Sequence, residues 1–158
     1  MRKDFYVFRH GETELNRQKR WQGSGTDCDL NAAGVRQAEE LLEKFRGKKL
    51  EVIFSSPLIR ARHTAEVVAG GLGLSCPEIL NNWYNSAEKY LDIRFPGGES
   101  KKEARDRVLK ELDALAAEPY QVAGAAIHGG TMGQLLNYYH VPYDKIPNCA
   151  ALHLVYED

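Results

Sequence analysis

The sequence has few cysteines, no marked excess of either charge and no long apolar run. Its three cysteines, Cys28, Cys76 and Cys149, are odd in number and widely spaced, so neither a disulfide framework nor a zinc site is indicated. The 21 basic residues are balanced by 22 acidic ones, so no global positive field would attract nucleic acid. The apolar run FYVF is too short for a signal-peptide core or a membrane span. We therefore expect a cytoplasmic protein with no nucleic-acid or membrane partner.

The length and composition are those of one soluble globular domain. The chain has 158 residues, of which 43% are hydrophobic and 27% are charged, and this length is ample for one substantial core. The sequence contains no internal repeat, low-complexity tract or long linker. We therefore expect a single domain over residues 1–158 with one functional site. The oligomeric state stays open, with a homodimer as one alternative.

Five short apolar segments are typical of β-strands in a sheet. They cover residues 5–8, 51–54, 76–80, 121–127 and 150–156. Segments with helical spacing lie between them. This alternation predicts an α/β domain in which a largely parallel sheet is covered by helices on both faces.

The helical segments carry recognisable start and stop signals. They cover residues 29–47, 57–74, 131–139 and a stretch that begins at residue 100. Asn31 is expected to cap the first helix and Gly47 to end it. Pro57 suits the first turn of the second helix. Ser100 and Glu103 have the spacing of a capping box at the start of another.

Charged and imidazole side chains follow three of the predicted strands. Arg9 and His10 come directly after residues 5–8, and Arg60 lies shortly after the second strand. His128 follows residues 121–127. Ligands of open α/β sheets bind beyond the carboxyl ends of the strands, so these side chains are expected to converge on one pocket for a compact dianion.

These residue types suit the transfer of a phosphoryl group. The planar guanidinium groups of Arg9 and Arg60 can each bind two phosphate oxygens and stay charged at any working pH. A neutral imidazole can attack phosphorus when its other nitrogen is held as a donor, often by a backbone carbonyl. A second imidazole, if protonated, would stabilise the equatorial oxygens. Glycines such as Gly129 allow backbone amides to approach the anion closely.

Five stretches of the chain resemble those of a known family. The sequences RHGETELN, GTDCDLNAAGVRQA, SSPLIRARHTAE, PGGES and IHGGTMGQLL have the order and approximate spacing found in the histidine phosphatase superfamily, in its phosphoglycerate mutase-like branch. The likeness extends over nearly the whole chain. It implies a three-layer α/β fold with a mostly parallel sheet and helices on both faces.

The resemblance also implies a mechanism that needs no metal or other cofactor. His10 would attack the substrate phosphate, surrounded by Arg9, Arg60 and His128, and water would then hydrolyse the phosphoenzyme. In such proteins the asparagine that corresponds to Asn16 also contacts phosphate.

Further positions of the phosphate pocket can be carried over from the family. Thr13, Gln22 and Gly23 stand where residues that line this pocket commonly occur in the family, and Gly129 is expected to offer its backbone amide.

The chain departs from the family pattern at the proton donor. Relatives usually carry a glutamate two residues after a leucine at the end of the third strand, and here Asn82 stands there. The segment from Asn82 to PGGES is also shorter than in typical mutases, which implies a reduced cap. We predict that the proton donor has moved to Glu88, or else is missing.

A small phosphatase is the function that these features favour. We expect hydrolysis of low-molecular-weight phosphate monoesters, with a phosphohistidine intermediate on His10. A phosphoglycerate mutase needs covering loops that exclude water, and we expect this chain to be too short to provide them. A protein phosphohistidine phosphatase and a non-catalytic phosphate-binding module remain as further alternatives.

Overall fold

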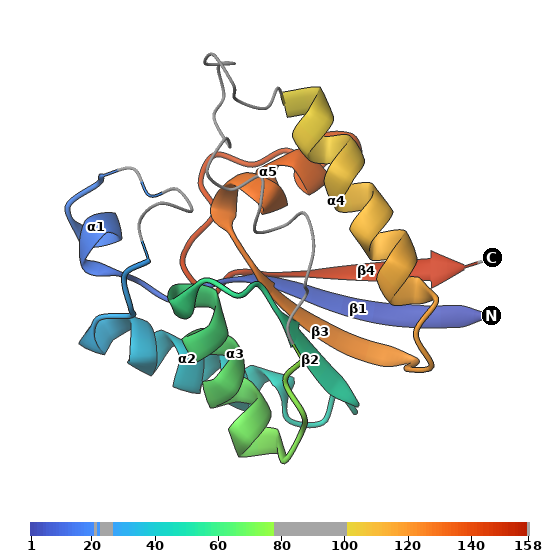
Figure 1. Ribbon diagram of the computed structural model, residues 1–158, viewed down its shortest axis with the longest axis horizontal. Coiled ribbons are helices and arrows are strands. Elements are labelled where there is room, and N and C mark those ends of the chain that lie inside the picture. Colours follow the sequence, from blue (N-terminus) through green and yellow to red (C-terminus); the bar gives the residue numbers. More distant parts are fainter. Residues whose placement is uncertain (21, 23–26, 78–100, 158) are drawn as a thin grey trace.

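A mixed sheet forms the centre of the fold in our computed structural model, which describes residues 1–20, 22, 27–77 and 101–157 (Figure 1). In the described part of the chain it contains β1 (Arg2–Arg9), β2 (Val52–Ser55), β3 (Val122–Ile127) and β4 (Ala151–Glu157), in the order β2-β3-β1-β4. The pairs β1–β3 and β2–β3 are parallel, and β4 runs antiparallel to β1. The prediction of a mostly parallel sheet is thus confirmed, with β4 as the exception.

The strands β1, β2 and β3 lie between two cores, and their apolar side chains alternate between them. In β1, Phe5 and Val7 belong to one core and Phe8 belongs to the other. In β2, Phe54 belongs to the first of these cores and Ile53 to the second. This alternation follows from the two-residue period of a strand, which sends successive side chains to opposite faces.

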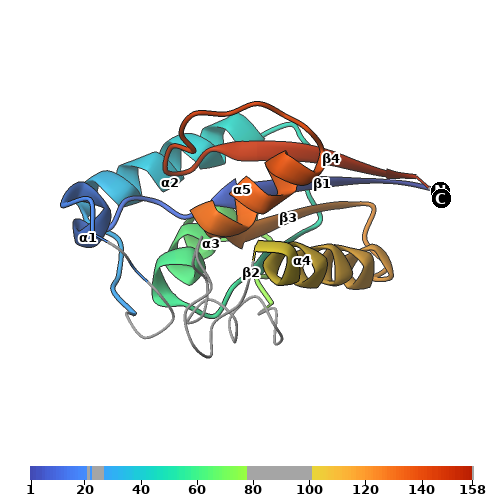
Figure 2. The ribbon, with the colours of Figure 1, turned by 90° about the horizontal axis from the view of Figure 1, so that it is seen from above.

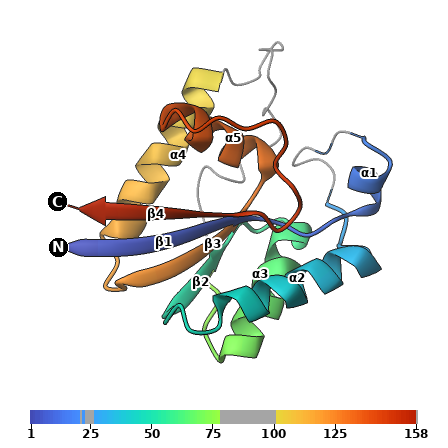
Figure 3. The ribbon, with the colours of Figure 1, turned by 180° about the vertical axis from the view of Figure 1, so that it is seen from behind.

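Helices cover both faces and complete the three predicted layers (Figures 1 and 3). Helices α2 (Ala32–Phe45) and α3 (Ile59–Leu72) pack on the face that carries Phe8 and Ile53. Helices α4 (Lys101–Ala116) and α5 (Gly129–Tyr138) pack on the opposite face. The chain ends lie together at the end of the sheet far from the short helix α1 (Glu14–Arg17) (Figure 2). No helix of the described residues is long and apolar enough to cross a membrane.

Several helix ends follow the predicted signals. The side chain of Asn31 accepts a hydrogen bond from the backbone amide of Gly34 at 2.8 Å, and Gly47 takes the left-handed conformation with φ of 84° just beyond α2. Helix α3 begins after Leu58, so Pro57 precedes the helix instead of standing in its first turn. Ser100, the predicted cap of α4, lies outside the described residues.

Two predicted strands need comment. Of residues 76–80, the part from 78 onward lies outside the described residues. The carbonyl groups of Ser75 and Pro77 accept hydrogen bonds from the amides of Ile53 and Ser55, so this segment runs alongside β2 without being part of a regular strand. The last strand is found as β4, at the edge beside β1.

Candidate active site

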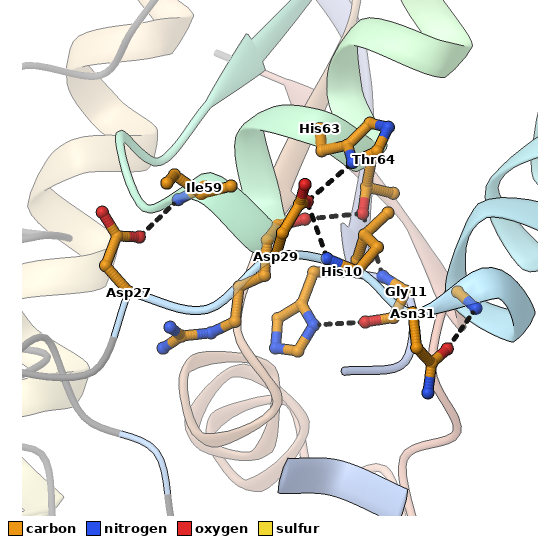
Figure 4. Close-up of polar contacts among 11 residues, drawn as sticks. His10, Gly11, Asp27, Asp29, Asn31, Ile59, His63 and Thr64 are labelled. Carbon is orange, nitrogen blue, oxygen red and sulfur yellow. Dashed lines mark hydrogen bonds and ion pairs between the residues drawn. The ribbon is translucent and has the colours of Figure 1, made fainter. Parts of the chain in front are cut away.

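His10 lies immediately after β1 and only 3% of its surface is exposed. Its Nδ1 atom lies 2.7 Å from the carbonyl oxygen of Gly11 (Figure 4). A carbonyl oxygen can only accept, so Nδ1 carries the proton and the lone pair is on Nε2. Burial, together with the charges of Arg9 and Arg60, lowers the pKa of His10 from 6.5 to about 3, although the bond to Gly11 opposes this shift. The imidazole is therefore neutral and has the tautomer of a nucleophile.

The loop that carries His10 is held by α3 and α2. The amide of Gly11 donates to Oγ1 of Thr64 at 2.9 Å, and this hydroxyl donates to the carbonyl of Arg60 at 2.8 Å (Figure 4). A Cβ atom at Gly11 would lie 2.5 Å from the carbonyl oxygen of Gly34 in α2, so the backbones approach too closely for any side chain. His10 is thus placed by backbone packing and one buried hydroxyl group.

The segment before α2 is attached to α3 by two carboxylates (Figure 4). Asp27 accepts a hydrogen bond from the backbone amide of Ile59 at 2.8 Å, in the first turn of α3. Asp29 pairs with Nδ1 of His63 at 2.7 Å. These contacts hold residues 27–29 against the helix that carries Arg60.

The two predicted arginines lie at the same edge of the sheet. Nη1 of Arg9 donates to the carbonyl of Ile146 at 2.5 Å, whereas its buried Nε has no partner among the described residues. A Cβ atom at Gly129 would lie 2.9 Å from this Nε, so the absence of a side chain at Gly129 makes room for the guanidinium group. Arg60 is 3% exposed in the first turn of α3. Burial lowers the pKa of both arginines below the usual value of this side chain, but such groups stay charged.

His128 faces His10 from the start of α5. The centres of the two imidazole rings are 5.5 Å apart, and Nε2 of His128 lies 2.9 Å from Oγ of Ser56. Its buried Nδ1 has no partner among the described residues. Burial, followed by the positive charge of Arg60, lowers the pKa of His128 well below 6.5. Burial therefore favours the neutral form of His128, and a nearby anion would favour the predicted protonated form by raising its pKa.

Asn16 is oriented by hydrogen bonds to its side-chain oxygen. Oδ1 accepts from the backbone amide of Thr13 and from Nδ2 of Asn148, both at 3.2 Å. Nδ2 of Asn148 also lies 3.2 Å from the carbonyl of His10. With the oxygen of Asn16 occupied in this way, its NH₂ group is the part that can donate to a ligand.

The side-chain oxygen of Gln22 is also held by two hydrogen bonds. Thr13, which was predicted to line the phosphate pocket, lies beneath it in the interior. Oε1 of Gln22 lies 2.9 Å from the hydroxyl of Thr13 and 2.8 Å from the thiol of Cys28. Thr13 is fully buried, caps α1 and does not line the cavity. Gly23 and Glu88 lie outside the described residues.

A cavity of about 500 Å³ lies at this edge of the sheet, between His10 and His128. The described residues that line it are Arg9, His10, Asn16, Lys19, Arg20, Gln22, Arg60, Arg107, His128, Gly129, Gly130, Thr131 and Asn148. This set includes five lysine or arginine residues and no carboxylate. It offers a concave, strongly positive site with a neutral imidazole, suited to a compact polyanion.

Some of the lining residues were not anticipated from the sequence, namely Lys19, Arg20, Arg107, Thr131 and Asn148. Thr131 is the third residue of α5 and follows His128 and two glycines. This position, in the first turn of a helix at the carboxyl end of a strand, was the sequence signal that could have predicted it. Arg107 and Asn148 come from α4 and from the segment before β4, and only the folded arrangement brings them to this edge.

Comparison with known proteins gives a consistent result. The family model of the histidine phosphatase superfamily (branch 1) matches residues 5–83. The uncharacterized phosphatase PhoE of Bacillus subtilis (strain 168) is 35% identical over 143 residues, which cover 82% of this chain and 74% of that protein. A protein of Salmonella choleraesuis (strain SC-B67) named "Probable phosphoglycerate mutase GpmB" is 31% identical over 156 residues, which cover 84% of this chain and 72% of that protein. The crystal structure of phosphoglycerate mutase from Bacillus anthracis has the same fold, with a TM-score of 0.79 at 20% identity. The match covers 99% of this chain and 88% of that protein.

Proposed function

The chain belongs to the histidine phosphatase superfamily, and from this membership we propose that it hydrolyses small phosphate monoesters through a phosphohistidine on His10. The observation that carries the proposal is the neutral imidazole of His10, whose Nδ1 is held by Gly11 inside a cavity with Arg9 and Arg60. A protonated imidazole has no lone pair for attack, so the lowered pKa suits a nucleophile at neutral pH.

In the proposed first step, Nε2 of His10 bonds to phosphorus while the bond from phosphorus to the ester oxygen breaks. Arg9 and Arg60 supply two positive charges against the two negative charges of the phosphoryl group. The departing alkoxide takes a proton, for which Glu88 remains the candidate donor. His128, whose Nδ1 has no hydrogen-bond partner in the described part of the chain, gains a proton more readily once the dianion is bound, and then stabilises an equatorial oxygen.

In the proposed second step, a water molecule attacks the phosphohistidine. The bond from Nε2 to phosphorus breaks, inorganic phosphate leaves and His10 returns to its neutral form. The water proton passes to the carboxylate that protonated the leaving group, which restores the starting state. No metal takes part, so we expect a chelator to leave the rate unchanged.

A mutase is the second candidate, because the curated relatives include proteins named "Probable phosphoglycerate mutase GpmB". A mutase passes the phosphoryl group back to the substrate and must exclude water. The sequence between Asn82 and Pro96 is short for that task. We therefore expect phosphate release to exceed interconversion of phosphoglycerates, and the opposite ratio would favour the mutase.

Trapping of the phosphoenzyme tests the proposal. Wild type mixed with ³²P-labelled substrate and quenched rapidly without acid should carry an acid-labile label, and His10→Ala should carry none. His140→Asn is the matched control, because His140 is exposed and asparagine tolerates its positive φ of 55°. Label that persists in His10→Ala, or that resides on serine, would overturn the assignment, and absence of turnover in wild type would favour a binding module.

A further inference from the structure

We propose that Ser56 is a positioning residue for His128, and that its hydroxyl group keeps a proton on Nδ1 of this imidazole for donation to the bound phosphate. The inference rests on the proposed function and concerns the same cavity. It makes His128 a hydrogen-bond donor in its neutral form, before the ring gains a second proton. It also assigns a role to a fully buried serine that the proposed mechanism does not otherwise use.

Ser56 and His128 are neighbours because they follow two adjacent parallel strands. Ser56 stands directly after β2 and His128 directly after β3, and Nε2 of His128 lies 2.9 Å from Oγ of Ser56. The backbone of Ser56 is fixed on both sides. Its amide donates to the carbonyl of Ala126 at 3.1 Å, and its carbonyl accepts from the hydroxyl of Ser55 at 2.7 Å. The end of the sheet therefore holds the hydroxyl group of Ser56 against His128.

The hydrogen bond between these two side chains has one favoured direction. The backbone amide of Leu58 approaches Oγ of Ser56 at 3.5 Å, so this oxygen already acts as an acceptor. Among the described residues, Nε2 of His128 is the only acceptor that bonds the hydroxyl group. A buried O–H that lacks an acceptor is costly. The hydroxyl of Ser56 therefore donates to Nε2, and a neutral ring carries its proton on Nδ1.

Nδ1 of His128 is the ring nitrogen that is left for a ligand. It is buried, it has no hydrogen-bond partner among the described residues, and His128 lines the cavity. His128 is also the N-cap residue of α5, yet its side chain accepts no hydrogen bond from the first turn of that helix. A bare Nδ1 would thus be a buried acceptor without a donor. The oxygens of a phosphoryl dianion only accept, so a protonated Nδ1 complements this ligand.

The surroundings of His128 favour the neutral ring, for which the tautomer matters. Burial is the largest cause that lowers the pKa of His128 well below 6.5. The groups whose charges act in the same direction come from the end of β1, from α3 and from α4, and they are Arg60, His10, Arg9 and Arg107. In a neutral ring only one nitrogen carries a proton, so the tautomer decides whether His128 offers a donor to the anion.

The same serine also suits the protonated ring. When a bound dianion raises the pKa of His128, the second proton goes to Nε2, because Nδ1 already carries one. The hydroxyl group of Ser56 then turns and accepts from Nε2, since a hydroxyl is both a donor and an acceptor. Nδ1 thus donates to the anion in both protonation states, and Ser56 keeps its contact with His128 in each of them.

Nitrogen NMR of the imidazole tests the tautomer without relying on turnover. In protein labelled with ¹⁵N-histidine, a bare ring nitrogen and one that carries a proton have well-separated ¹⁵N shifts. The spectrum of His128→Asn identifies the signals of His128 among those of the five histidines. At pH 7 wild type should show a protonated Nδ1 and a bare Nε2. A bare Nδ1, or two protonated ring nitrogens, would overturn the proposal whether or not the protein hydrolyses phosphate esters.

Binding of sulfate measures what the tautomer contributes. Sulfate stands in for the phosphoryl dianion, and neither its charge nor that of His10, with a pKa of about 3, changes between pH 6 and 8. Ser56→Ala removes the group that selects the tautomer, so at pH 8 it should bind sulfate roughly tenfold more weakly than wild type. At pH 6 the difference should narrow, because a protonated His128 donates from Nδ1 without the serine. The affinity of this variant therefore falls as the pH rises through the pKa of His128 in the complex.

Ser55→Ala is the matched control. It removes the neighbouring buried hydroxyl, which bonds the carbonyl of Ser56, and it should keep the wild-type tautomer and affinity at both pH values. An equal loss in Ser55→Ala, or a Ser56→Ala variant that matches wild type at pH 8, would overturn the role of Ser56. Hydrolysis of nitrophenyl phosphate by wild type tests the proposed function separately, since neither the tautomer nor sulfate binding depends on turnover.

Discussion

Nδ1 of His10 lies 2.7 Å from the carbonyl oxygen of the very next residue, Gly11. The tautomer of the candidate nucleophile is therefore set by its own chain neighbour and needs no distant carboxylate. Thr64 holds the amide of the same Gly11 at 2.9 Å, so one residue both orients the imidazole and ties it to α3. This relationship leads to two of the predictions that follow.

The lowered pKa of His10 predicts a specific dependence of stability on pH. In the unfolded chain His10 gains a proton below about pH 6.5, whereas in the folded protein it stays neutral down to about pH 3. Between these values the unfolded state binds more protons, so the free energy of unfolding falls as the pH falls. We expect His10→Gln to reduce this slope by about 1.4 kcal/mol per pH unit, well below pH 6.5.

Urea denaturation at pH 7, 6 and 5 measures this slope. His140→Asn, which replaces an exposed histidine, is the control: its free energy of unfolding should depend on pH with the same slope as that of wild type. Parallel curves for wild type and His10→Gln would show that His10 titrates alike in the folded and unfolded states, against the prediction.

Removal of the Thr64 hydroxyl should loosen the loop that carries His10. Thr64→Val keeps the shape but leaves the buried amide of Gly11 without its acceptor, which should cost about 1–3 kcal/mol in the free energy of unfolding. Because the misplaced loop also misplaces His10, kcat/KM should fall. Thr64→Ser keeps the hydroxyl group and should recover most of both quantities, and a serine variant as impaired as the valine one would contradict this role.

A methyl group at Gly129 should displace Arg9 with little effect on folding. Its Cβ would lie 2.9 Å from Nε of Arg9, so the guanidinium group must shift from its present position. We expect Gly129→Ala to lower kcat/KM about 100-fold, the usual effect of a misplaced binding group. Gly70→Ala is the control, since its Cβ would meet nothing within 4 Å, and it should raise stability by about 0.5–1 kcal/mol without loss of activity. Full activity of Gly129→Ala would refute the argument.

The layers of the fold were predictable because the local patterns agree with the packing. Residues 5–8 and 51–54 have no charged side chain at their centre, as expected of strands that helices cover on both faces. The antiparallel direction of β4 was not predicted. In hindsight the signal was His153 between Leu152 and Leu154, an alternation of polar and apolar residues that is typical of a half-exposed edge strand.

The site was predictable as far as its residues directly follow strands. Arg9, His10 and His128 stand at the carboxyl ends of β1 and β3, and those ends are adjacent because the strands are parallel. Asn148 could not be inferred, because it reaches Asn16 across 132 positions of sequence and belongs to no regular element. No local pattern encodes such a contact.

The proton donor is the part of the proposed mechanism that depends on sequence alone. Asn82 stands where relatives carry a glutamate, and an amide cannot release a proton on demand. Glu88, six positions later, is the nearest acidic residue after the lost one, and it lies outside the described residues. The alternative is that Glu88 is an ordinary solvated carboxylate.

Two esters with different leaving groups distinguish these alternatives. An alkyl oxygen is a poor leaving group and needs a proton as it departs, whereas nitrophenolate departs without help. If Glu88 is the acid, Glu88→Gln should lower kcat about 100-fold on an alkyl phosphate, yet only slightly on nitrophenyl phosphate. Asp92→Asn removes a carboxylate from the same stretch and should spare both rates. Equal and minor effects of Glu88→Gln on both esters would remove Glu88 from the mechanism and would favour activated phosphoryl donors such as phosphohistidine.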